Sequence, residues 1–200
     1  MTGAEARARL AAAARAEGAP SSDYDLNAHV ALPEGRVLRP AAVLVAALEG
    51  RSGAEMLLTE RASTLRHHPG QVAFPGGKHD TNDASLVATA LREAREEVGL
   101  PPETVEVLGL LPPHETVTGY LVTPVLAWVP AAFRPVAEPG EVAEVFTVPL
   151  AHLADPARYV VRARRWRGQE RRFFAVPYGP HYIWGATARM LRALADRMPR

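Results

Sequence analysis

Cysteine is absent from the chain. Its absence excludes disulfide frameworks, thiolate nucleophiles and cysteine-ligated zinc or iron–sulfur sites. An excess of either charge is also absent, because 23 lysines and arginines balance 22 aspartates and glutamates to a formal net charge of +1. A general nucleic-acid-binding protein usually has a marked basic excess, so nucleic acid is not expected as a partner.

Long apolar runs are missing as well. The longest of them, such as Pro40 to Leu48, fall well short of the roughly 20 residues that span a bilayer, so no membrane partner is expected. Hydrophobic residues nevertheless make up 48% of the 200 residues. This composition predicts a soluble globular domain with a sizeable core.

The first 38 residues are expected to form an N-terminal extension with an Ala- and Arg-rich helix. The helix would end near Gly18. Arg7, Arg9 and Arg15 interrupt the apolar core that a secretory signal needs, so we expect a surface helix and a cytoplasmic protein. Residues 39–200 then form one domain, because no repeat or low-complexity linker divides them.

Strand and helix patterns are mixed along the domain. Short apolar runs predict strands, and longer stretches with helical periodicity predict two helices. The expected strands cover 41–48, 55–59, 105–111, 120–129 and 144–148, a hairpin covers 159–164 and 172–176, and the helices cover 84–98 and 184–198. This mixture predicts an α/β domain, or an α+β domain, with a mixed sheet and layered helices.

The predicted helix over 84–98 has an acidic strip beside its apolar face. At about 100° per residue, Glu93, Glu96 and Glu97 fall within an arc of roughly 100°. Like charges at these spacings repel one another and destabilise a helix. A divalent cation would relieve the repulsion, and ligands that are all oxygen indicate Mg²⁺ or Mn²⁺.

The simpler interpretation of the strip is a solvated acidic patch neutralised by Arg92 and Arg95. The segment before the helix argues against it, because Phe74-Pro75-Gly76-Gly77 offers flexible backbone that a phosphate or a metal can approach closely. A Gly-Gly pair alone is weak support, since most such pairs are turns. The combination favours a functional site.

Residues 77–100 resemble the Nudix box, which is written G-x5-E-x7-R-E-U-x-E-E-x-G-U, with U a bulky apolar residue. The matching segments are Gly77-Lys-His-Asp-Thr-Asn-Asp83 and Arg92-Glu-Ala-Arg-Glu-Glu-Val-Gly-Leu100. Asp83 stands in place of the first Glu, eight residues rather than seven separate it from Arg92, and Ala94 is small. The half from Arg92 to Leu100 is otherwise intact.

The segment upstream resembles the signature of the Nudix coenzyme A pyrophosphatases, L-L-T-x-R-(S/A)-x3-R-x3-G-x3-F-P-G-G. It reads Leu57-Leu-Thr-Glu-Arg61-Ala-Ser-Thr-Leu-Arg66-His-His-Pro-Gly70-Gln-Val-Ala-Phe74-Pro-Gly-Gly77, and every fixed position is present. The resemblance implies a Nudix α/β/α sandwich over residues 39–200. It also implies hydrolysis of the pyrophosphate bond of coenzyme A, with Mg²⁺ or Mn²⁺, to 3′,5′-ADP and 4′-phosphopantetheine.

The resemblance also suggests roles for individual residues. Glu93 and Glu97 are the expected primary metal ligands, Glu96 would join when further ions bind, and the carbonyl of Gly77 is a backbone ligand. Arg92 is expected to orient the glutamates. The general base stays open among Glu96, Glu141 and Glu144.

Cationic side chains in or beside the signature are the expected phosphate contacts: Arg61, Arg66 and Lys78. The arginines between Arg158 and Arg172 either form a solvated face or, in part, meet the 3′-phosphate of coenzyme A. His67 and His68 are adjacent and would point apart in an extended chain, so they are not expected to share a metal.

Two other functions remain to be weighed against coenzyme A hydrolysis. The first is the same chemistry on ADP-ribose or another nucleoside diphosphate derivative, since the acidic helix alone does not choose the substrate. The second is a catalytically silent Nudix module that binds a nucleotide or a protein. Such modules usually lose one of the helix carboxylates, and here Glu93, Glu96 and Glu97 are all retained. The oligomeric state and the preference for free or acylated coenzyme A are left open.

Overall fold

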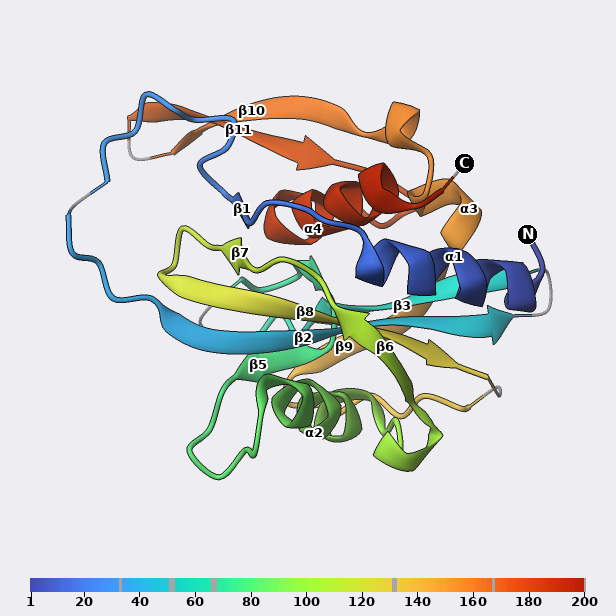
Figure 1. Ribbon diagram of the computed structural model, residues 1–200. Coiled ribbons are helices and arrows are strands. Elements are labelled where there is room, and N and C mark those ends of the chain that lie inside the picture. Colours follow the sequence, from blue (N-terminus) through green and yellow to red (C-terminus); the bar gives the residue numbers. More distant parts are fainter. Residues whose placement is uncertain (33, 51–52, 66–67, 131–132, 167, 200) are drawn as a thin grey trace.

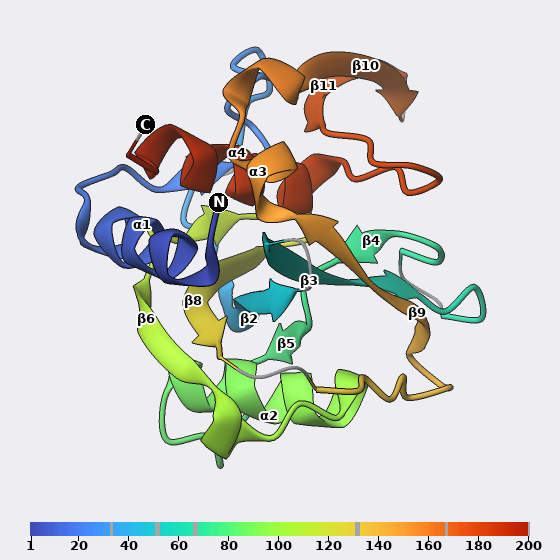
Figure 2. The same ribbon diagram turned by 90° about the vertical axis from the view of Figure 1, so that its right-hand side faces the viewer.

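The computed structural model describes residues 1–200 except 33, 51–52, 66–67, 131–132, 167 and 200. A mixed β-sheet lies between two helical layers (Figure 1). Helix α2 (Leu86–Val98) covers one face of the sheet, and helices α1 (Gly3–Arg15), α3 (Leu150–Leu153) and α4 (Gly185–Arg197) cover the other (Figure 2). The α/β/α sandwich expected from the sequence is thereby confirmed. Among the described residues, no helix combines the length and the apolar character needed to cross a membrane.

The main sheet has nine strands within the described part of the chain. Their hydrogen-bonded order is β1-β7-β8-β2-β3-β4, and in addition β6 pairs with β8, β5 with β2 and β9 with β3. The pairs β2–β8 and β1–β7 are parallel, and the others are antiparallel. The bounds are β1 Ser21–Ser22, β2 Arg39–Gly50, β3 Gly53–Arg61, β4 Val72–Ala73, β5 Gly76–Lys78, β6 Glu106–Leu110, β7 His114–Glu115, β8 Tyr120–Val129 and β9 Val142–Pro149.

A separate two-stranded hairpin, β10 (Val160–Trp166) and β11 (Gln169–Ala175), matches the predicted one. It lies on the α4 side of the sheet, away from α2 (Figure 2). Two short 3₁₀ helices, η1 (Pro102–Thr104) and η2 (Pro156–Arg158), lead into β6 and β10.

Strand β2 is buried on both faces, which explains its nearly continuous apolar sequence. Successive side chains of a strand point to opposite faces. Even-numbered residues from Ala42 to Ala46 accordingly pack in the core under α2, and odd-numbered residues from Ala41 to Ala47 pack in the core under α1 and α4. The strand therefore anchors both helical layers.

Helix α2 begins and ends where its sequence provides caps. The Ser85 hydroxyl accepts a hydrogen bond from the Ala88 N–H at 3.1 Å. Gly99 ends the helix in the left-handed conformation, with φ 70°, and its N–H donates to the Arg95 carbonyl. Fully buried small residues on one side, Ala90 and Ala94, let the helix lie close to the sheet. The close packing therefore fixes the position of the polar side of α2 relative to β5.

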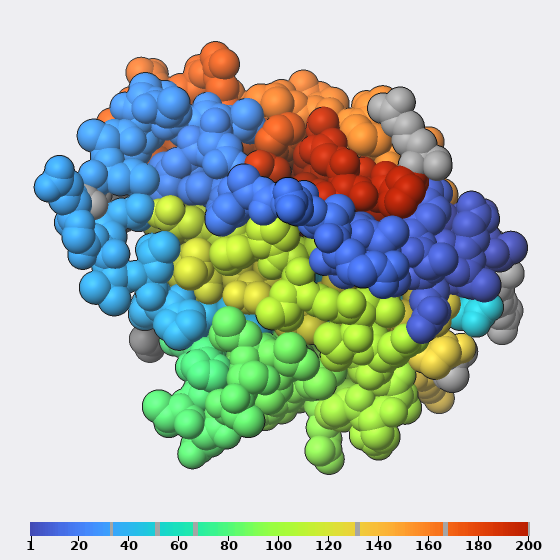
Figure 3. All heavy atoms as spheres, viewed as in Figure 1, coloured from blue at the N-terminus to red at the C-terminus, as the bar shows by residue number. Residues whose placement is uncertain are grey.

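Helix α1 is part of the domain's core on one side. Ala6, Leu10 and Ala13 are fully buried in the same cluster as residues of α4. The expectation of a surface helix therefore describes only its outer face. Figure 3 shows the N-terminal segment lying across the molecule between α4 and strand β6, where Arg7 forms an ion pair with Glu106.

Candidate active site

The two glycines of β5 bring the backbone directly against the carboxylates of α2. The Gly76 N–H donates to Glu97 Oε2 at 3.1 Å. A Cβ atom at Gly77 would overlap the Glu93 carboxylate, so any other residue here would push that carboxylate out of its present position. The close approach places the Gly77 backbone beside Glu93, as the expected role of its carbonyl requires.

Burial raises the pKa values of two glutamates of α2, Glu93 and Glu97. Glu97 is only 4% exposed, and burial raises its pKa to about 7. The hydrogen bond from Gly76 opposes this shift, and repulsion from Glu93 adds to it. The pKa of Glu93 is also raised, mainly by burial. Negative charge on this pair is therefore costly without a cation.

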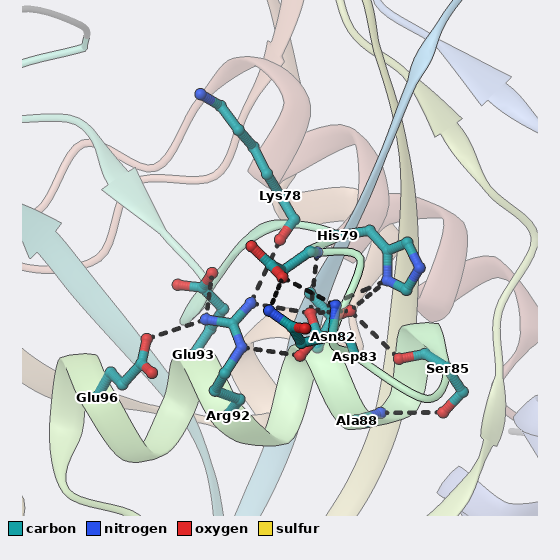
Figure 4. A network of polar contacts seen from close by, with 11 residues as sticks. Lys78, His79, Asn82, Asp83, Ser85, Ala88, Arg92, Glu93 and Glu96 are labelled. Atoms are coloured by element: carbon teal, nitrogen blue, oxygen red, sulfur yellow. Dashed lines mark hydrogen bonds and ion pairs between the residues drawn. The ribbon is translucent and has the colours of Figure 1, made fainter.

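Arg92 joins the carboxylates of the helix to the loop before it (Figure 4). Its guanidinium donates to both oxygens of Asp83, each at 2.9 Å, and to Glu93 and Glu96, each at 3.0 Å. The bidentate pair with Arg92 holds the pKa of the Asp83 carboxyl well below its usual range. Arg92 thus contacts two of the three glutamates, and its orienting role stays a prediction. The geometry explains the departure at Asp83, which binds Arg92 instead of joining the glutamates.

A buried hydroxyl group donates a hydrogen bond to Asp83. Thr89, which is fully buried, donates to Asp83 Oδ2 at 2.9 Å and lies 2.8 Å from Nδ1 of His79. Sequence reasoning missed both Thr89 and His79. A threonine on the buried side of a helix, six residues after an acid, is the signal that could have indicated them.

Two residues outside the helix approach the same carboxylates. Arg61, the last residue of β3, is half-buried, and its charge lowers the pKa of Glu97. Its Nε atom is buried and has no hydrogen-bond partner among the described residues. Glu141 raises the pKa of both Glu93 and Glu97. The loop before Glu141 runs along the end of α2, where the Glu138 N–H donates to the Glu97 carbonyl at 3.0 Å.

Glu144 lies on the other face of the sheet. It stands opposite Glu60 in the β3–β9 pairing, and Glu60 stands opposite Val72 of β4. Directly paired residues share a face, and Val72 belongs to the core under α4. The side chain of Glu144 therefore does not point toward Glu93 and Glu97.

The other expected phosphate contacts are placed differently from Arg61. The side chain of Lys78 extends away from the Arg92 network in Figure 4, and only its carbonyl accepts a weak bond from Arg92, at 3.4 Å. Arg66 and His67 lie outside the described residues. The described hairpin arginines between Arg158 and Arg172 lie on the α4 side, apart from α2 (Figure 2), and Arg167 lies outside the described residues.

The residues around α2 fit a hard divalent cation. The donors are carboxylate oxygens and a backbone carbonyl, which are the ligands that Mg²⁺ and Mn²⁺ prefer. Two of the carboxylates have raised pKa values and would be neutralised by the ion.

Comparisons with known proteins agree with this arrangement. The model of the NUDIX domain matches residues 38–167. The chain is 48% identical over 157 residues to Nudix hydrolase NudL of Enterobacter sp. (strain 638), covering 78% of this chain and 81% of the relative. It is 49% identical to the NudL of Cronobacter sakazakii over the same shares.

Solved structures show the same fold. A Nudix hydrolase of M. smegmatis, RenU, has a TM-score of 0.55 at 23% identity, covering 84% of this chain and 98% of that one. The MutT protein of Methanosarcina mazei Go1 has a TM-score of 0.51 at 19% identity, covering 82% of this chain and 97% of that one. The chain belongs to the Nudix family, whose hydrolases cleave the diphosphate bond of nucleoside diphosphate derivatives.

Proposed function

We propose that the protein hydrolyses the pyrophosphate bond of coenzyme A, or of its thioesters, to 3′,5′-ADP and 4′-phosphopantetheine. The observation that supports this most is the backbone of the signature segment over its described residues, 57–65 and 68–77. Its loop closes back on Arg61, whose N–H donates to the Gln71 carbonyl at 3.1 Å and whose carbonyl accepts from the Gly70 N–H at 3.0 Å. The signature thus holds Arg61 beside Glu97 with an unpartnered donor.

Glu93, Glu97 and the carbonyl of Gly77 are the residues that would hold Mg²⁺ or Mn²⁺, and Glu96 is available for a further ion. When bound, such a cation neutralises diphosphate oxygens and lowers the pKa of a coordinated water. Arg61 would donate to a non-bridging phosphate oxygen, where a charge-assisted bond stabilises the negative charge. Arg92 would orient Glu93 and Glu96, to which it donates hydrogen bonds.

Glu141 is the proposed general base. It would accept the proton of the water that attacks phosphorus, while the bond from phosphorus to the bridging oxygen breaks and that oxygen leaves on the second phosphate. Glu96 is a weaker candidate because Arg92 donates to its carboxylate, which is 58% exposed. Glu144 is a weaker candidate because its side chain lies on the other face of the sheet.

The substrate is tested by measuring kcat/KM for coenzyme A, dephospho-coenzyme A and ADP-ribose with Mg²⁺, with the products identified by mass. A site built for coenzyme A has cationic groups that lose their partner when the 3′-phosphate is missing. Losing charge-assisted bonds of about 1.5–3 kcal/mol lowers kcat/KM by roughly 10- to 150-fold for dephospho-coenzyme A. If ADP-ribose is the best of the three, the coenzyme A assignment is wrong, although the Nudix chemistry stands. Hydrolysis of none of them would favour a silent binding module.

A further inference from the structure

A second group of ionisable side chains lies on the sheet face opposite α2. Glu60 of β3 and Glu144 of β9 are direct cross-strand partners. Like charges placed directly opposite one another destabilise an antiparallel pair. No arginine or lysine among the described residues forms an ion pair with either glutamate. The two side chains are 36% and 54% exposed, so water screens part of their repulsion, and a bound cation would relieve the rest.

His181 approaches both glutamates. Its Nδ1 lies 3.8 Å from Glu60 Oε2, and its Nε2 lies 4.0 Å from Glu144 Oε1. Both distances are too long for hydrogen bonds. The ring is only 12% exposed, yet neither nitrogen has a hydrogen-bond partner in the described part of the chain. The imidazole thus lies beside two carboxylates without a direct hydrogen bond to either, an arrangement that residues sharing a small cation would have.

The position of the His181 ring is fixed in advance. It stacks on Phe146 with ring centroids 3.6 Å apart and an interplanar angle of 7°. Its backbone closes a turn with Tyr178 through two reciprocal hydrogen bonds of 3.0 Å. The ring therefore cannot turn freely toward solvent, and its nitrogens stay near the glutamates.

We propose that Glu60, Glu144 and His181 bind a zinc ion, at a site separate from the carboxylates of α2. One ligand atom from each residue lies within 4.8 Å of the others, and ligands of tetrahedral zinc, at about 2.0–2.2 Å from the metal, require only a modest contraction of this triangle. An imidazole with two carboxylates suits zinc, whereas Mg²⁺ takes oxygen ligands alone. The ion would fasten the loop before α4 to strands β3 and β9.

The experiment is a zinc titration of the full chain, followed by calorimetry and by thermal unfolding. A Glu93→Gln/Glu97→Gln double variant removes the ligands of α2 and isolates the proposed site. We expect this variant to bind one zinc ion per chain. At a zinc concentration about 100-fold above Kd, its Tm should rise by roughly 5–10 °C.

Variants of the proposed ligands decide the location. His181→Gln and Glu60→Gln, each added to the double variant, should weaken zinc binding at least tenfold. His152→Gln is the matched control, because His152 lies beside Tyr178 of the same turn but faces the Pro177 carbonyl. Two results would overturn the proposal. One is zinc uptake that survives both ligand substitutions. The other is the absence of zinc uptake by the double variant, which would leave a protonated His181 as the cation.

Discussion

Two groups of carboxylates lie on opposite faces of one sheet, and they are neutralised in different ways. Around α2, Arg92 and the Gly76 N–H already donate to the glutamates, and Arg61 lies close by. Around β9, the ion-pair partner of Glu60 and Glu144 among the described residues is the imidazole of His181. Within the described part of the chain, arginine side chains accompany the first group, whereas none forms an ion pair with the second. The comparison supports the two proposals, phosphate chemistry at the α2 face and metal binding alone at the other.

The largest expected effect concerns Glu97 of the α2 group. Glu97→Gln keeps the shape and can still accept the hydrogen bond from Gly76, but it removes the charge that would hold the cation. Turnover at saturating Mg²⁺ should fall by about 10²- to 10³-fold, as the loss of a key electrostatic group does. Steady-state kinetics measure it, with Glu103→Gln, an exposed glutamate, as the control. Turnover close to wild type in Glu97→Gln would contradict the proposed metal site.

A second prediction compares Glu141, the proposed general base near α2, with Glu144 on the other face of the sheet. Glu141→Gln should lower kcat by about 10²-fold, the lower end of what a general base contributes, with metal affinity at α2 retained. Glu144→Gln should lower kcat less, because its carboxylate lies on the other face. Kinetics and Mn²⁺ binding of both variants provide the measurement. A larger loss in Glu144→Gln would reverse the assignment, and a parallel loss of Mn²⁺ affinity in Glu141→Gln would make that residue a ligand.

The α2 group was predictable because its information is local. The spacing of Glu93, Glu96 and Glu97 fixes their common side on any helix, and Ser85 and Gly99 mark where that helix begins and ends. The nearly continuous apolar run of β2 likewise indicates a strand buried on both faces.

The other face was not predictable because it depends on pairing between distant segments. Whether Glu141 or Glu144 approaches α2 depends on the register of β9 against β3, which shifts between Glu60 and Arg61. A shift of one residue moves a side chain to the other face. His181 comes from a third segment, and no local pattern relates it to Glu60.

The smallest expected effect is on the stability of the metal-free protein. The pKa of Glu97 rises from its ordinary 4.5 to about 7 on folding. Below pH 4.5 the carboxyl is protonated in both states and costs nothing. As the pH rises toward 7, Glu97 ionises first in the unfolded chain, so the free energy of unfolding falls. Above pH 7 the carboxyl is ionised in both states, and the free energy of unfolding stays lower by the full amount.

Glu97→Gln removes this titration. In EDTA, the variant should therefore be more stable than wild type at pH 8, by on the order of 1–3 kcal/mol, and the two should converge near pH 4.5. Urea unfolding at both pH values measures the difference, with Glu103→Gln expected to show no such trend. Excess Mg²⁺ at pH 8 should cancel or reverse the advantage, because the cation binds only the folded protein with its carboxylates intact. An advantage that is equal at both pH values would mean that the substitution acts through packing instead of charge, and the contrast between the two faces would then lose its electrostatic basis.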